Sequence, residues 1–167
     1  MTLEALAPHR LPFTRAVEDP QPLPYLDSAS NRAAGAIDIR LQVRLQTAAM
    51  QAVGHPGDCI AGTSYRHAYW TMAQIVTHHS VNGCNLRPGD LLGIGTLSGP
   101  GPGEAGALIE LTAGGKLPVR LSSGEARTFL EDGDSVVLRG RCERVGAAPI
   151  GFGECRGTVL PAHPAMA

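Results

Sequence analysis

A glutamate enclosed by apolar residues is the first candidate for chemistry. Glu110 lies between Ile109 and Leu111, in an apolar run that predicts a strand over residues 107–112. A carboxylate in such surroundings is costly unless it is paired. A carboxylate that holds a histidine can turn that histidine into a general base for water. The alternative is an outward-facing carboxylate, which strand alternation alone favours.

A threonine after two glycines is the second candidate. Thr96 follows Gly93 and Gly95, and the apolar run predicts a strand over residues 91–96. A hydroxyl at a strand end can hydrogen-bond the carboxylate of a substrate. The alternative, a hydroxyl that caps a turn, is the commoner outcome on spacing alone.

Two adjacent histidines, His78 and His79, raise the question of a metal site. Neighbouring positions on a helix point about 100° apart, so the pair cannot share a metal as residues four apart do. This geometry favours histidines that pack at a helix end, and no metal ligand is predicted in the chain. Cys84 is interpreted as a buried thiol.

Two glycine-containing turns are interpreted as structural. The Gly-Pro repeat over residues 99–103 lacks the Lys-Ser/Thr ending and the following helix of a phosphate-binding loop. Gly133, flanked by Asp132 and Asp134, predicts a hairpin turn.

One helix is expected to position the central part of the chain. Apolar residues at steps of three and four predict it over residues 64–81, with Thr63 and Ser64 as candidate N-caps. Asn82 and Gly83 are suited to end it. The run Arg87-Pro88-Gly89-Asp90 then predicts a tight turn.

Strands are expected on both sides of this helix. Strict alternation predicts a half-buried strand over residues 37–45. Further strands are predicted over residues 117–121, 127–130, 135–142 and 151–160, separated by Gly-rich turns. The predicted fold class is mainly β, a sandwich or roll with one long helix packed on it. The proline-rich residues 1–30 predict only a short helix at residues 2–7, and the predicted divisions are 1–30, 31–162 and a fraying tail at 163–167.

Composition excludes several classes of function. The net charge is −1, with no basic tract, which excludes a nucleic-acid surface. No run of 18 apolar residues and no signal-peptide pattern is present, so we expect neither a membrane span nor secretion. Four dispersed cysteines predict reduced thiols in a cytoplasmic protein.

Long motifs resemble one known family. The run HHSVNGCNLRPGDLL at residues 78–92 is the most specific of them. The other matching segments are residues 22–26, 69–72, 95–96, 98–100, 108–111, 129–130, 132–134, 150–155 and 159–162. Together they resemble the C-terminal portion of the fumarylacetoacetate hydrolase family. The resemblance runs over nearly all of this chain, yet the chain looks like less than half of a family member.

The resemblance implies an activity. Family enzymes of this type hydrolyse a carbon–carbon bond in 4-fumarylacetoacetate, giving fumarate and acetoacetate in tyrosine and phenylalanine degradation. Glu110 matches the glutamate that partners the catalytic histidine, and Thr96 matches a threonine that contacts substrate. The resemblance also implies Mg²⁺ or Ca²⁺, with ligands outside this chain, and a homodimer or a complementary N-terminal half as partner.

Three hypotheses follow from the resemblance. The first is a C-terminal part of such an enzyme that needs the missing N-terminal part for activity. The second is a non-catalytic remnant or a dimerising β module. The third and weakest is a different hydrolase that acts on a related diketo acid.

Overall fold

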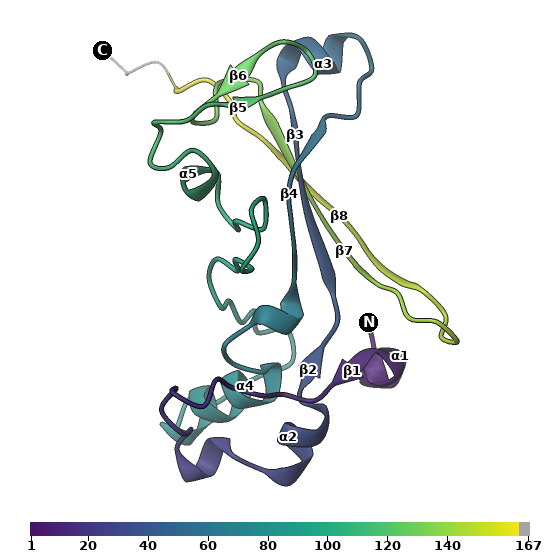
Figure 1. Ribbon diagram of the computed structural model, residues 1–167, viewed down its shortest axis with the longest axis vertical. Coiled ribbons are helices and arrows are strands. Elements are labelled where there is room, and N and C mark those ends of the chain that lie inside the picture. The colour runs from purple at the N-terminus through teal and green to yellow at the C-terminus, as the bar shows by residue number, and fades with distance from the viewer. Residues whose placement is uncertain (164–167) are drawn as a thin grey trace. The chain divides into compact units, whose positions relative to one another are not determined.

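The computed structural model describes residues 1–163, and the chain forms two compact units. The first unit comprises Met1–Ile39, Ser64–Leu97 and Cys142–Ile150, and the second comprises Arg40–Thr63, Ser98–Arg141 and the residues from Gly151. The chain is mainly β, with antiparallel sheets and short helices, which confirms the predicted fold class (Figure 1). No helix within residues 1–163 is both long and apolar enough to cross a membrane.

The first unit contains most of the helices. Its elements are α1 (Leu3–Leu6), β1 (Arg10–Leu11), α2 (Ala29–Ala34), β2 (Ala36–Ile37) and α4 (Met72–Val81). The predicted helix at residues 2–7 is confirmed as α1, whose N-cap hydroxyl on Thr2 accepts the Ala5 N–H. The remainder of residues 1–30 is more regular than predicted, because β1 pairs with β2.

The longest helix in the described residues is shorter than predicted. α4 has ten residues and begins at Met72, not at residue 64. Its N-cap is Thr71, and reciprocal hydrogen bonds between Thr71 and Gln74 form a capping box. Ser64 instead caps a 3₁₀ turn, Tyr65–His67. The predicted stop is confirmed, since Asn82 is the C-cap and Gly83 has a φ of +87°.

The second unit is organised around one sheet. Its elements are β3 (Arg40–Gln46), α3 (Ala48–Ala52), β4 (Asp58–Ser64), α5 (Leu108–Leu111), β5 (Val119–Arg120), β6 (Ala126–Arg127), β7 (Ser135–Cys142) and β8 (Ile150–Thr158). The four long strands form a sheet in the order β4-β3-β7-β8 (Figure 1). β3 and β7 are antiparallel, and their register places Leu45 opposite Val136.

The apolar core of this unit lies over β3 and α3. Leu45, Met50 and Leu121 are buried, and Ile60 and Val136 pack partly buried against them. Removing apolar area of this kind from water stabilises a fold by about 25 cal/mol per Å². The alternation predicted for residues 37–45 accounts for the buried Leu45. The continuous strand is nevertheless wrong, because β2 ends at Ile37 and β3 starts at Arg40.

Three further strand predictions are wrong, one of them at residues 127–130, because β6 ends at Arg127. Residues 91–96 form no strand in the described structure, and Leu91 is 96% exposed. Gly95 has a φ of +81°, which does not fit an extended strand. A strand was also predicted over residues 107–112, but residues 108–111 form the helix α5. By contrast, the strand predicted over residues 135–142 is confirmed as β7.

Candidate functional site

Glu110 lies on the exposed side of the one-turn helix α5. The backbone N–H groups of Glu110 and Leu111 both donate to the Ala107 carbonyl, which closes the turn. Leu108 and Leu111, three residues apart, line a small apolar cavity of about 220 Å³ with residues of the sheet. The inward leucines leave the Glu110 carboxylate outward, so the helical period replaces the predicted alternation.

The Glu110 carboxylate is held through one of its two oxygens. Its Oε2 accepts a hydrogen bond from Ser98 Oγ at 2.6 Å and another from the Gly106 N–H at 3.1 Å. The Gly106 N–H also lies 3.1 Å from Ser98 Oγ. Within residues 1–163, Oε1 makes no hydrogen bond. The carboxylate is therefore fixed in orientation while one oxygen stays available to a further donor.

The Gly-Pro loop positions Ser98. The Gly99 N–H donates to the Glu104 carbonyl at 2.8 Å, and the Gly101 N–H donates to Glu104 Oε2 at 2.9 Å. A Cβ on Gly99 would collide with the Glu104 carboxylate and lie 2.9 Å from Thr63 Oγ1. The Gly62 N–H donates to the Gly103 carbonyl, which ties the loop to β4. The loop uses its Gly99 and Gly101 amides to bind the backbone carbonyl and the carboxylate of Glu104, which agrees with a structural interpretation.

Thr96 lies in the first unit, whereas Glu110 lies in the second. Thr96 is exposed in an irregular segment. The two residues predicted to serve one site are thus not brought together within either unit. Ser98 was not predicted, although a hydroxyl immediately before the Gly-Pro loop was a signal for it.

The two histidines make different contacts, as their 100° separation requires. His78 Nδ1 lies 2.9 Å from Tyr25 Oη, and the two rings stack. His79 Nε2 lies 3.2 Å from the Cys84 thiol. Cys84 is exposed, so the prediction of a buried thiol is wrong. Gly83, with its positive φ, turns the chain at the helix end and leaves Cys84 outside.

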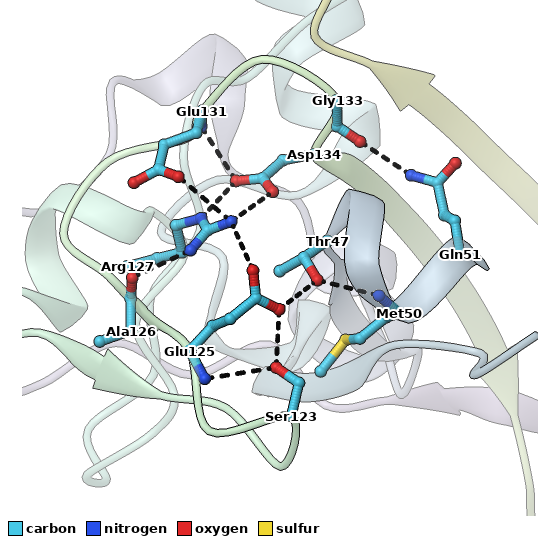
Figure 2. A network of polar contacts seen from close by, with 10 residues as sticks. All are labelled: Thr47, Met50, Gln51, Ser123, Glu125, Ala126, Arg127, Glu131, Gly133 and Asp134. Carbon is cyan, nitrogen blue, oxygen red and sulfur yellow. Dashed lines mark hydrogen bonds and ion pairs between the residues drawn. The ribbon is translucent and has the colours of Figure 1, made fainter. Parts of the chain in front are cut away.

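A second polar cluster in the second unit is centred on a buried ion pair (Figure 2). Arg127 Nε and Nη2 donate to the two carboxylate oxygens of Asp134 at 2.8 and 3.1 Å. Asp134 is fully buried. Hydrogen bonding to Asp134 raises the pKa of the Arg127 guanidinium, and a hydrogen bond from Thr47 lowers the pKa of Glu125. The φ of +87° at Gly133 confirms a turn, but the predicted hairpin is wrong, because β6 and β7 do not pair with each other. The ion pair was not predicted.

The described residues do not fit a resident divalent cation. No group of three or more His, Cys, Asp or Glu side chains within residues 1–163 could hold a metal ion. The carboxylates of Asp58, Glu125 and Asp134 are already engaged by Ser122, Thr47 and Arg127. Any chemistry of Glu110 therefore does not depend on a cation held by these residues.

Comparison with known proteins assigns the family. Residues 15–160 match the model described as fumarylacetoacetate (FAA) hydrolase C-terminal. The chain belongs to the fumarylacetoacetate hydrolase family. It is 45% identical to the fumarylacetoacetase of Homo sapiens over 160 residues, which are 96% of this chain and 36% of the relative. It is 46% identical to that of Caenorhabditis elegans over 162 residues and 44% identical to that of Arabidopsis thaliana over 165 residues. In both cases the match covers nearly all of this chain, 97% and 98%, and 36% of the relative.

This chain therefore spans about a third of the length of the relatives it matches. Membership of the fumarylacetoacetate hydrolase family confirms the resemblance carried by the motifs. The part that is shared includes α4, the Gly-Pro loop and Glu110, because all of them lie within the matched residues.

Proposed function

We propose that this chain is the C-terminal part of an enzyme that hydrolyses a carbon–carbon bond in 4-fumarylacetoacetate, releasing fumarate and acetoacetate. One observation carries the proposal: Ser98 and Gly106 fix the Glu110 carboxylate and leave its Oε1 without a partner in the described residues. The names of the relatives support the substrate class.

The proposed role of Glu110 is to orient a histidine supplied from outside this chain. Its open oxygen accepts the N–H of the imidazole, which fixes the tautomer and stabilises the imidazolium that forms. The other ring nitrogen takes a proton from water, whose oxygen adds to a carbonyl carbon of the diketo acid. The carbon–carbon bond then breaks, and the acetoacetate carbanion takes up a proton. General-base catalysis of this kind contributes about 10²–10⁴-fold.

Thr96 has a separate proposed role in binding. Its exposed hydroxyl donates to a carboxylate of the substrate. Replacing Thr96 by valine keeps the shape and removes the donor, so KM for the substrate should rise. Thr96→Ser keeps the hydroxyl and is the matched control.

The partners in this proposal are the N-terminal part of the enzyme and a second copy of the complete protein. The N-terminal part supplies the base histidine and the ligands of the implied Mg²⁺ or Ca²⁺, since the described residues do not fit such an ion. The cytoplasm is the proposed location, in keeping with the free cysteines in the described chain.

The test is reconstitution. The purified chain is mixed with the N-terminal part of a complete relative, with Mg²⁺ or Ca²⁺, and release of fumarate is followed by NMR. Turnover is expected only in the mixture. Glu110→Gln should lower it at least about 100-fold. Glu154→Gln is the matched control, because Glu154 is an exposed glutamate paired with Arg139 on another strand.

Each contrary outcome contradicts a different claim of this proposal. Turnover by the chain alone would overturn the need for an N-terminal part. Equal turnover by the Glu110→Gln mixture would overturn the role of Glu110. A mixture that forms a complex by gel filtration but releases no fumarate would favour a non-catalytic module.

An association module is the second candidate function, and exposed apolar residues favour it. Leu91, Leu92 and Ile94 are exposed in a segment without secondary structure. Apolar surface of this kind marks interaction sites in soluble proteins. Sedimentation of the isolated chain over a range of concentrations tests it, and replacing these three residues by serine should shift any association to higher concentration.

A further inference from the structure

A thiol and an imidazole meet at the C-terminal end of α4. The helix ends at Val81, Asn82 is its C-cap, and Gly83 turns the chain with a φ of +87°. Asn82 Oδ1 accepts the Cys84 N–H at 3.0 Å, which fixes the turn. Cys84 Sγ then lies 3.2 Å from His79 Nε2. The helix end and the turn at Gly83 therefore place the Cys84 thiol beside the His79 imidazole.

An imidazole in this position can activate the thiol. The thiolate is the nucleophilic form of cysteine, and an adjacent histidine accepts the proton and stabilises the anion. His79 lies in the last turn of α4, so the helix end holds its ring beside the thiol. His78 contacts Tyr25 and not Cys84, and both His78 and Tyr25 line the apolar pocket described below.

The other three cysteines are internal references. Cys142 is buried, and burial raises the pKa of its thiol. Cys59 is exposed, and its thiol lies 3.6 Å from the Ala61 carbonyl. Cys155 is exposed on β8. In the described part of the chain, only Cys84 contacts an imidazole.

An apolar pocket lies against the same histidine. It has a volume of about 500 Å³ within the first unit, and its walls include Leu23, Tyr25, Trp70, Ile75 and His79. The Arg15 guanidinium lies 4.0 Å from the centre of the Trp70 ring and 4.3 Å from that of Tyr69. Pockets of about 300–1,000 Å³ with aromatic walls are typical of small-molecule sites. His79 therefore belongs both to the thiol pair and to a pocket wall.

We propose that Cys84 is a modification site for α,β-unsaturated carbonyl compounds, whose apolar body is held in the pocket beside His79. In the reaction the Cys84 S–H bond breaks and its proton moves to the imidazole. The sulfur forms a bond to the β-carbon, and the carbon–carbon double bond becomes an enolate. The α-carbon then takes the proton back, so thiol and electrophile add without an oxidant or a leaving group.

The test compares cysteines within one chain. The protein is treated with limiting N-ethylmaleimide, and labelling of each cysteine is followed by peptide mass spectrometry. Cys84 is expected to react about tenfold faster than Cys155. His79→Gln should remove most of that advantage and leave Cys155 unchanged. His67→Gln is the matched control, because it alters a histidine of the same unit that does not line the pocket and keeps the Cys84–His79 contact. Equal rates at Cys84 and Cys155, or no effect of His79→Gln, would overturn the proposal.

A second comparison tests the pocket. N-Phenylmaleimide is used beside N-ethylmaleimide, and the ratio of their rates is measured at Cys84 and at Cys155. The ratio should be about fivefold larger at Cys84, because the phenyl ring buries apolar area in the pocket. Ile75→Ala should reduce it, whereas Val76→Ala, at a position that does not line the pocket, should not. Far-UV circular dichroism verifies that each variant folds. Equal ratios at the two cysteines would overturn the role of the pocket.

Discussion

Two glutamates in the second unit, Glu125 and Glu110, are each bound by a hydroxyl, yet their surroundings differ. Glu125 Oε2 accepts hydrogen bonds from Thr47 at 2.5 Å and Ser123 at 2.8 Å, and its Oε1 lies 3.2 Å from Arg127 Nη2 (Figure 2). Within the described residues 1–163, Glu110 accepts hydrogen bonds only through Oε2. A carboxylate whose two oxygens both accept hydrogen bonds can stabilise a fold. One that is anchored through a single oxygen can accept a further donor.

The neighbours of the two glutamates deepen the difference. Arg127 and Asp134 bury their charges behind Glu125, with side-chain exposures of 9% and 0%. Ser98, the partner of Glu110, is exposed. A charge that is buried and paired is expensive to disturb, whereas an exposed contact is not. Mutations around Glu125 should therefore lower the free energy of unfolding more than mutations around Glu110 do.

The largest loss of stability is expected when Arg127 is replaced by leucine. The substitution leaves the Asp134 carboxylate buried without its partner, which costs about 3–5 kcal/mol of the free energy of unfolding. Urea unfolding followed by circular dichroism measures it. Arg139→Leu is the matched control, because the Arg139–Glu154 ion pair is exposed and should contribute only about 0–1 kcal/mol. A similar loss of stability in both variants would contradict the expected difference between the buried and the exposed ion pair.

Removing one hydroxyl from each cluster gives the next effect. Thr47 is buried, caps α3 by accepting the Met50 N–H, and donates to Glu125. Thr47→Ala should cost about 1–2 kcal/mol, mainly through the lost cap. Ser98→Ala removes the corresponding partner of Glu110 from an exposed loop and should change stability by less than about 0.5 kcal/mol. Thermal unfolding of the two variants tests this, and the reverse order would refute it.

Acid should weaken the second unit through Glu125 and Asp58. A hydrogen bond from Thr47 lowers the pKa of Glu125, and one from the Ser122 N–H lowers the pKa of Asp58. Because both pKa values are lower in the folded state, the stabilisation is present above the unfolded-state pKa, about 4. It is lost as the pH falls through the folded-state pKa. Urea unfolding between pH 6 and about pH 3 should show this decline, and Glu125→Gln should make it shallower. Parallel pH curves for the two proteins would count against the assignment.

The smallest stability effect is expected at Glu110. Glu110→Gln should change the free energy of unfolding by less than about 0.5 kcal/mol, because the side chain is exposed and the amide oxygen still accepts from Ser98. Glu125→Gln should destabilise the chain more, since it removes the charge that faces Arg127. Urea titrations of the two variants provide the comparison. A loss at Glu110 as large as that at Glu125 would make Glu110 a structural residue.

Local patterns predicted the parts of the fold that depend on neighbours in sequence. β7 coincides with the predicted strand. Along its first half, the buried Ser135 and Val137 alternate with the less buried Val136 and Leu138. The turn at residues 87–90 is also confirmed, with a hydrogen bond from the Asp90 N–H to the Arg87 carbonyl and a φ of +98° at Gly89. Proline, glycine and strict alternation leave the backbone few alternatives.

The candidate site could be predicted only in part. Leu-Ile-Glu-Leu is apolar on either a helical or an extended period, and the four residues of α5 are too few to separate the two. The Glu110–Ser98 contact joins residues 12 apart across a loop, so it depends on the backbone of residues 99–106. The Arg127–Asp134 pair was hidden for a similar reason, because the residues meet only after the intervening turn closes. The role of Glu110 came from the family resemblance and remains a proposal.

The register between β3 and β7 has a consequence for the order of folding. Arg40 is opposite Arg141 and Gln46 is opposite Ser135, so the central pairing of the sheet joins residues about a hundred positions apart. β4, the other neighbour of β3, follows it closely in the chain. During synthesis at about 5–20 residues per second, β7 leaves the ribosome roughly 4–14 s after β4. β3 and β4 can therefore pair first. The other edge of β3 then stays unpaired until β7 has been synthesised.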